Sequence, residues 1–367
     1  MTSRPALRLD QLSLRGFRNL ESLDLSPGGR FNVLFGDNGQ GKSNLLEAIH
    51  YLGALESFRL ARRDSLIQHD ATRAVIAGKF ASRPAPITAK IGLDRKKARV
   101  LSLNGKRPRS KATWIASIQM VLFHPGDLSL ASGGPQGRRD FVDRLLEKMD
   151  SGYSKTRAAY TKALRSRNRL LKRDPSDRRS ITSYDTLLAQ HGAVIGAARS
   201  ALVDQLGPLT STAFTEIAGD ELPLAVTYRP RVAPEQSLML TALERSLSKD
   251  LARGFTAEGP HADDIALTVR SRGARHHASQ GQHRMMVLAL KIAELQVIAE
   301  RVGRAPILLL DDVSSELDSI RNARLMSLLH RLGCQVFVTT THRALIRIDA
   351  GADRVDCQLR AGRVISS

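Results

Sequence analysis

The sequence contains few cysteines, few aromatic residues and no long apolar segment. Two cysteines in 367 residues, Cys334 and Cys357, are too few for a disulfide-built scaffold, and they form no C-x-x-C metal motif. The N-terminal residues lack the apolar core of a secretion signal, and no stretch approaches the roughly 18 apolar residues that cross a bilayer. We therefore expect a cytoplasmic protein that does not act in a membrane.

Acidic residues are scarce relative to basic ones. The chain has 36 Asp and Glu against 56 Lys and Arg, of which 43 are Arg, and its formal net charge is +20. Because the planar guanidinium group binds phosphate oxygens in pairs, this excess indicates a polyanionic partner. The overall composition, 42% hydrophobic and 25% charged, is typical of a globular protein, and the length suits more than one domain.

The spacing of apolar residues predicts an α/β fold that is interrupted by helices. Apolar residues recur at helical spacing from about residue 141 to about residue 215, and again over 281–300. We therefore predict a discontinuous α/β lobe, residues 1–120 and 220–367, and a mainly helical lobe, residues 121–219. Strands are expected at 7–14, 31–35, 74–80, 87–93, 99–103, 222–228, 265–269, 307–310 and 336–339, with a positive-φ hairpin turn at Asn104-Gly105.

The segment from Gly36 to Ser43 satisfies the phosphate-loop pattern G-x-x-x-x-G-K-[ST]. It stands between a predicted strand and a predicted helix, which is the context that this motif requires. The alternative is a chance glycine-rich turn. In the functional interpretation Lys42 neutralises the β and γ phosphates and Ser43 binds Mg²⁺. We expect nucleotide contacts from Gly36, Asp37, Asn38, Gly39, Gln40, Gly41, Lys42, Ser43 and Asn44.

Two adjacent carboxylates follow the apolar strand at 307–310. Ligands of α/β sheets bind at the carboxyl ends of the strands, so Asp311 and Asp312 are expected beside the phosphates. Asp311 suits a contact to Mg²⁺, and Asp312 suits the orientation or deprotonation of an attacking water. An acidic turn without a catalytic role is the alternative.

A second helix start is also suited to phosphate. Ser279, Gln280, Gly281 and Gln282 precede the helix expected over 281–300, and Ser279 is placed to cap it. The backbone amides of such a helix start point toward an anion, although the serine could equally be a cap and nothing more. Together with the phosphate loop, this segment predicts a nucleotide that is sandwiched between two surfaces.

The order of these motifs resembles the ATPase head of ABC and SMC proteins. Ser279 to Gln282 resemble the signature motif, and Ser315, Glu316, Leu317 and Asp318 resemble the D-loop. His342, which follows the expected strand at 336–339, resembles the switch histidine that senses the γ phosphate. The resemblance implies catalytic roles for Lys42, Asp311, Asp312 and His342. Gln119 and His124 are both weak candidates for the Q-loop residue.

Within this superfamily the chain resembles the RecF family. The shared motifs run from residue 14 to residue 342, and include Leu14-Arg15-Gly16-Phe17-Arg18-Asn19 and Gly259-Pro260-His261-Ala262-Asp263-Asp264. About 240 residues between Lys42 and Ser279 leave no room for the long coiled coil of SMC proteins. The resemblance implies a slow, DNA-stimulated ATPase, in which ATP joins two copies around DNA and hydrolysis releases it. It also implies partners of the RecO and RecR kind, recombinase loading at single-strand gaps, and support of the SOS response.

Two basic segments are candidates for the DNA surface. Residues 95–115 contain eight Lys and Arg and no acid, and residues 155–179 contain ten against two Asp. A solvated charged face is the usual explanation of one such run, but two runs in a chain of this charge favour contacts to DNA phosphates. Because aromatic residues are few, base stacking is not indicated, and duplex or gapped DNA bound through its backbone is expected.

Two other functions remain as alternatives. The chain could bind ATP and DNA as a scaffold with negligible turnover, or it could be a phosphotransferase acting on a small metabolite. The phosphotransferase would leave the signature-like segment and the positive charge unexplained. His261, Asp263 and Asp264 do not suit one tetrahedral metal ion, because three ligands within four residues crowd it, and a turn before the strand at 265–269 is expected instead.

Overall fold

The computed structural model describes residues 5–174, 176–219, 222–313, 317–348 and 353–366. Its residues divide into two compact units. The first unit comprises residues 1–128, 212–222 and 279–367, and the second comprises residues 129–211 and 223–278. Among the described residues, no helix is both long enough and apolar enough to cross a membrane.

A mainly parallel six-stranded sheet carries the predicted motifs in the first unit. Its strand order is β14-β13-β3-β12-β11-β7, and all neighbouring pairs are parallel except β13 with β14. The central strands are almost entirely buried, because both faces of the sheet are covered. The bounds are β3 Phe31–Phe35, β7 Met120–Phe123, β11 Ile307–Leu310, β12 Val336–Thr340, β13 Arg354–Arg360 and β14 Arg363–Ser366.

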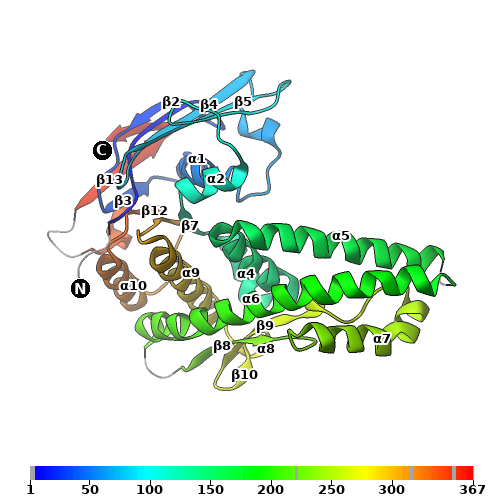
Figure 1. The fold of residues 1–367 in the computed structure, drawn as a ribbon. Coiled ribbons are helices and arrows are strands. Elements are labelled where there is room, and N and C mark those ends of the chain that lie inside the picture. The colour runs from blue at the N-terminus through cyan, green and yellow to red at the C-terminus, as the bar shows by residue number, and fades with distance from the viewer. Residues whose placement is uncertain (1–4, 175, 220–221, 314–316, 349–352, 367) are drawn as a thin grey trace. The chain divides into compact units, whose positions relative to one another are not determined.

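The first unit also contains an antiparallel sheet of order β2-β1-β4-β5-β6 and helix α1, Lys42–Ala54. Helix α1 contacts strands of both sheets (Figure 1), and its Leu45, Leu46 and Ile49 are completely buried. The helix that follows the phosphate loop is therefore fixed on two sides. The strands are β1 Arg8–Phe17, β2 Leu20–Leu25, β4 Arg73–Ala81, β5 Ile87–Asp94 and β6 Val100–Leu103.

The first unit also contains three further helices and three short turns among its described residues. They are α2 Lys111–Ser117, α9 Gln280–Val302, α10 Ser319–Leu332 and the short turns η1 Arg63–Leu66, η2 Pro125–Leu128 and η4 Arg343–Leu345. Helix α9 packs on β7 and η2. The Asn104-Gly105 turn has φ values of 51° and 77°, which confirms the positive-φ prediction.

The second unit combines long helices with a small sheet. Helix α5, Ser151–Arg173, lies alongside α6, Arg178–Ala218 (Figure 1), whose residues from 212 group with the first unit. Arg167 of α5 is completely buried, and it donates to Asp185 and Asp250 at 2.7 Å each. The other elements are α3 Ser129–Ser132, α4 Pro135–Met149, β8 Leu224–Arg229, α7 Gln236–Arg253, η3 Pro260–Ala262, β9 Asp264–Val269, β10 Arg272–Gly273 and α8 Ala274–His277.

The lobe boundaries differ from those expected from sequence. Residues 121–123, expected in the helical lobe, belong to β7, which pairs with β11 in the first unit. Residues 223–278, expected in the α/β lobe, group with the helices because β8 and β9 pair with each other in a separate sheet, of order β10-β9-β8. Each expected strand is present, but spacing missed β2, β7, β10, β13 and β14, and it does not show which sheet a strand joins.

Candidate nucleotide-binding site

The phosphate loop lies between β3 and α1, where the sequence places it. Gly36, Gly39 and Gly41 have φ values of 143°, 80° and 106°, which side-chain-bearing residues rarely adopt. A Cβ atom on Gly36 would lie 2.4 Å from the carbonyl oxygen of Leu359 in β13. The glycines of the motif are therefore required both for the backbone path and for close packing on the neighbouring strand.

Lys42 reaches back over this loop. Its Nζ atom donates to the carbonyl oxygens of Gly36, at 2.6 Å, and Asp37, at 2.8 Å. Burial lowers the pKa of Lys42, and the nearby carboxylates of Asp312, Asp37 and Asp311 oppose that shift. The ammonium group thus lies over the curled backbone, where it can exchange carbonyl contacts for phosphate oxygens.

Asp311 joins the loop to the adjacent strands. The Ser43 hydroxyl donates to Asp311 Oδ1 at 2.8 Å, and the Thr339 hydroxyl donates to the same oxygen at 2.8 Å. The backbone N–H of Asp312 in turn donates to Thr339 Oγ1 at 2.9 Å. Since β3, β12 and β11 are neighbours in the sheet, their carboxyl ends bring these groups together.

A hydroxyl and a carboxylate held together fit a hard cation such as Mg²⁺. Mg²⁺ usually takes one or two protein oxygens and completes its shell with water and phosphate. Among the described residues no three His, Cys, Asp or Glu side chains form a metal-binding group, so Ser43 and Asp311 would need a phosphate ligand to complete such a site. His261, Asp263 and Asp264 have other partners, and η3 forms the turn there that the sequence predicts.

The start of α9 has the geometry that its sequence predicts. Ser279 Oγ accepts from the Gln282 backbone N–H at 3.2 Å, and Gln282 Oε1 accepts from the Ser279 N–H at 2.8 Å. This reciprocal pair is a capping box, so the prediction that Ser279 caps the helix is confirmed. Ser279 and Gln280 are exposed, and a Cβ on Gly281 would meet nothing closer than 4.0 Å. The helix start is therefore open to an approaching group.

The two phosphate-directed segments belong to different parts of the sheet. The phosphate loop follows β3, whereas α9 packs on β7, which lies three strands away in the order β3-β12-β11-β7. At the usual strand spacing this is about 14 Å. The strand order does not by itself bring Ser279 to the phosphate loop of the same chain.

His342 and Asp318 come after β12 and β11, two parallel neighbouring strands whose carboxyl ends lie at the same edge of the sheet. His342 follows β12, is exposed, and its backbone N–H donates to Thr340 Oγ1 at 3.4 Å. Asp318 caps α10 by accepting from the Arg321 N–H at 2.9 Å. Ser315 and Glu316 lie outside the described residues.

The structure separates the two Q-loop candidates. Gln119 precedes β7 and is buried at the amino end of the strand, away from the edge that carries Asp311. His124 follows β7 at that edge, because Phe123 pairs with Leu310. Position in the sheet therefore favours His124.

Several side-chain contacts near the loop were not expected from the motifs. Asn44 donates to Asn19 Oδ1 at 2.8 Å and accepts from Arg59 Nη1 at 2.8 Å. Glu47, completely buried in α1, is paired with Arg18 through both carboxylate oxygens. A glutamate among the apolar residues of α1 was a sequence signal for this cluster.

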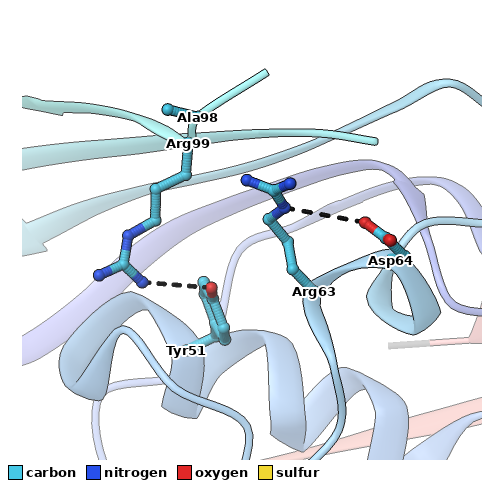
Figure 2. Close-up of a pocket in the computed structure, with 5 residues that line it drawn as sticks. All are labelled: Tyr51, Arg63, Asp64, Ala98 and Arg99. Atoms are coloured by element: carbon cyan, nitrogen blue, oxygen red, sulfur yellow. Dashed lines mark hydrogen bonds and ion pairs between the residues drawn. The ribbon is translucent and has the colours of Figure 1, made fainter. Parts of the chain in front are cut away.

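A surface pocket of about 490 Å³ lies beside α1 (Figure 2). Arg99 donates to the hydroxyl of Tyr51 at 3.4 Å, and Arg63 lies 3.8 Å from Asp64. The two guanidinium groups give the pocket a basic rim that the phosphate-loop motif does not account for.

Together, the loop between β3 and α1, the carboxylates after β11 and the capped start of α9 define an ATPase head of the ABC type. Residues 8–355 match the RecF/RecN/SMC N-terminal domain family. The DNA replication and repair protein RecF of an Anaeromyxobacter species, strain Fw109-5, is 40% identical over 98% of this chain and 99% of its own length. RecF of Myxococcus xanthus is 37% identical over 98% and 97%. This chain belongs to the RecF family of DNA replication and repair proteins.

Solved structures agree with this assignment. The recombination mediator protein RecF-ATP of the RecFOR pathway is 28% identical and superposes with a TM-score of 0.86, covering 100% of this chain and 99% of that one. The Smc head domain from Pyrococcus furiosus, at 16% identity and a TM-score of 0.60 over 98% of this chain and 96% of that one, shares the fold. The predicted fold class, an α/β ABC-type head with a mainly helical second lobe, is confirmed.

Proposed function

We propose that this chain binds ATP with Mg²⁺ and that the bound nucleotide joins two copies. The observation that carries the proposal is the 2.8 Å contact of Ser43 with Asp311, because it brings the end of the phosphate loop to the carboxylate pair. Lys42 is held over the loop backbone, where it would face the β and γ phosphates. Ser43 and Asp311 would hold Mg²⁺, which would offset negative charge on the phosphates.

The second surface for the nucleotide comes from another copy. The capping box leaves the first amides of α9 directed outward at an exposed helix start. In a two-fold dimer the start of α9 in one copy would face the phosphate loop of its partner, and the interface would hold two ATP molecules. The bound triphosphate would then be part of the interface rather than a ligand of one chain.

Hydrolysis would open this dimer. Asp312 is placed by its backbone contact to Thr339 and by a φ of 52°, beside the carboxylate that would hold the metal ion. We assign it the orientation or deprotonation of the attacking water, and we assign His342 the contact to the γ phosphate. Loss of that phosphate would remove the group that both copies share, so a slow ATPase would act as a switch.

DNA is the proposed polyanionic partner, but only some of the basic residues in the two runs are free to contact it. Arg95 donates to five backbone carbonyl oxygens and therefore holds its own loop. Arg157 pairs with three acids, and Arg167 is buried. The exposed ones are Lys96, Lys97, Lys106, Arg107, Arg109 and Lys111 in the first unit, and Lys155, Lys162, Arg165, Arg169, Lys172, Arg173, Arg178 and Arg179 in the second.

These exposed residues suit the phosphate backbone of DNA. Lys162, Arg165 and Arg169 lie three and four positions apart on α5, so they share one face of that helix. In the first unit, Lys96 and Lys97 adjoin the basic pocket of Figure 2. Such contacts give sequence-independent affinity, as a repair protein that acts at arbitrary positions needs.

We further propose that the chain acts in the cytoplasm, where it helps mediator proteins of the RecO and RecR kind to load recombinase at single-strand gaps and supports the SOS response. The support is its family membership and the RecFOR pathway named for its structural neighbour.

Sedimentation velocity with and without ATP tests the nucleotide-dependent dimer. We expect the native chain to sediment as a monomer alone and as a dimer with ATP and Mg²⁺, and Ser279→Arg to remain a monomer. Ser110→Arg is the matched control, because Ser110 is also an exposed serine cap, accepting from the Thr113 N–H of α2 at 3.1 Å. A Ser279→Arg chain that dimerised like the control would contradict the proposal.

A further inference from the structure

The last hairpin of the chain is bonded to the middle of the phosphate loop. Gln40 Oε1 accepts from the backbone N–H of Ala361 at 2.6 Å, and the Gln40 carbonyl oxygen accepts from the N–H of Gly362 at 3.0 Å. Ala361 and Gly362 form the turn between β13 and β14. Two successive donors of this turn therefore end on one residue of the loop.

The turn also fits closely against its surroundings. Ala361 and Gly362 have φ values of 48° and 77°, and a Cβ on Gly362 would lie 2.2 Å from the carbonyl oxygen of Asn19. Gly36, the first residue of the phosphate-loop motif, packs on the carbonyl of Leu359 near the end of β13. The β13–β14 hairpin thus contacts the first and the fifth residue of the phosphate-loop motif.

A second turn, from the opposite end of the chain, contacts the same loop. Asn19 lies in the turn between β1 and β2, where it accepts from Asn44 Nδ2 at 2.8 Å. A Cβ on Gly41 would lie 3.1 Å from the Asn19 side chain. The preceding Arg18 is fixed to Glu47 of α1 by hydrogen bonds of 3.0 Å. This places the Leu14–Asn19 motif of the sequence beside the phosphate loop.

We propose that these two turns position the phosphate loop for ATP, with Gln40 as a positioning residue whose side chain holds the C-terminal hairpin. Asn19, Gln40, Ala361 and Gly362 are called the loop brace below. The inference rests on the proposed function, since it concerns the ATP site of that function. A loop that is already held in its binding conformation does not lose that freedom on binding, so the brace raises affinity for the nucleotide.

Two variants on opposite sides of this contact test the brace. Gln40→Leu removes the acceptor of the Ala361 amide, and Gly362→Ala places a Cβ against the Asn19 carbonyl. We expect each to weaken ATP binding about tenfold in isothermal titration calorimetry, which corresponds to the loss of roughly one net hydrogen bond. In Gly362→Ala the hydrolysis rate per bound ATP should stay the same, because Gly362 is not among the residues assigned to the nucleotide or to its hydrolysis.

Gly303→Ala is the matched control for backbone strain. Gly303 ends α9 with a φ of 73°, close to that of Gly362, and a Cβ there would meet nothing within 4 Å. It should lower the melting temperature without changing the dissociation constant for ATP. Ala361→Gly retains the amide donor and relieves the positive φ, so it should bind ATP at least as tightly as the native chain.

The double variant separates a shared contact from two unrelated defects. If Gln40 and Gly362 act through one brace, Gln40→Leu combined with Gly362→Ala should bind ATP no more weakly than either alone. Additive losses, or native affinity in Gln40→Leu, would overturn the inference. If Gly362→Ala does not fold, Gln40→Leu compared with Ala361→Gly still decides it. Absence of ATP binding in the native chain would instead contradict the proposed function.

Discussion

Ser43 and Asp311 lie 268 positions apart in the sequence and share a hydrogen bond of 2.8 Å. The contact exists because β3, β12 and β11 are parallel neighbours whose carboxyl ends meet at one edge of the sheet. Thr339 of the central strand donates to the same carboxylate oxygen. The oxygen cluster that would receive Mg²⁺ is therefore set by the strand order.

Lys42→Ala should abolish ATP binding, because it removes the ammonium group that lies over the phosphate loop. Calorimetry with ATP and Mg²⁺ measures the effect, and a loss of at least about a hundredfold in affinity is expected for a charged contact of this kind. Lys90→Ala is the control, since Lys90 is an exposed lysine on β5. Equal ATP affinity in the two variants would contradict the assignment of Lys42.

Asp312→Asn should leave ATP binding intact and slow hydrolysis. If Asp312 accepts a proton from the attacking water, the amide cannot replace it, and turnover should fall by about a hundredfold or more. The ATP-bound dimer should then persist during sedimentation in Mg²⁺. A native rate of hydrolysis in this variant would show that another residue orients or deprotonates the attacking water.

Thr339→Val should disturb hydrolysis through Asp311 rather than through the fold alone. The hydroxyl is buried, donates to Asp311 and accepts from the Asp312 N–H, so valine removes both contacts at similar volume. We expect the Mg²⁺ concentration for half-maximal ATPase activity to rise several-fold, with Thr339→Ser restoring it. An unchanged Mg²⁺ requirement in the valine variant would show that Thr339 does not orient the carboxylate.

His261 should make the second unit less stable in mild acid. Burial lowers its pKa from 6.5, and the neighbouring Arg139 lowers it further, while Thr256, Asp263 and Asp250 oppose the shift. Because the folded pKa lies below the unfolded one, the unfolded chain takes up the proton first as pH falls through 6.5. Stability should therefore decrease below that pH, by at most about 1.4 kcal/mol per pH unit.

Urea unfolding at pH 7.5 and 5.5 measures this dependence. His261→Gln, which cannot take up a proton, should reduce the difference between the two pH values even if it destabilises the unit. His69→Gln is the control, because His69 is exposed. An equal pH dependence in the native chain and in His261→Gln would contradict the prediction.

Replacing Lys162, Arg165 and Arg169 together by alanine should weaken DNA binding and flatten its dependence on salt. Each lost phosphate contact reduces the slope of log affinity against log salt by about 0.9 for duplex DNA. Fluorescence anisotropy at several salt concentrations measures the slope, with the exposed Arg144→Ala of α4 as control. A native slope in the triple variant would exclude this face of α5 from the DNA surface.

Sequence periodicity predicted the elements that form the site more accurately than their assembly. Residues 31–35 and 307–310 form strands with the expected limits, because each is a short apolar run that ends at glycine or at two acids. The capping box of Ser279 was also predictable, since a cap is a local structure. The grouping of β8 and β9 with the helices was not predictable, because strand pairing depends on residues distant in sequence.

The loop brace could not be predicted from the motifs either, because its contacts also join residues that are distant in sequence. Gln40 belongs to the phosphate-loop pattern, and only its tertiary contact to Ala361 shows that its side chain has another partner. The sequence also overestimated how many residues of the basic runs are available to DNA. Arg95 and Arg167 count as positive charges in the sequence, but Arg95 bonds to backbone carbonyl oxygens and Arg167 is buried. Composition gives the number of charged residues, but it does not show which of them are exposed.

Disulfide cross-linking between two copies tests the central claim most directly. One copy would carry Asn38→Cys in the phosphate loop and the other Gln280→Cys at the start of α9, both exposed positions, while the native Cys334 and Cys357 are buried. The account predicts a cross-linked dimer of the two different variants that forms with ATP and Mg²⁺ and not without them. Failure of these two positions to cross-link while ATP is bound, or equal cross-linking without ATP, would contradict it.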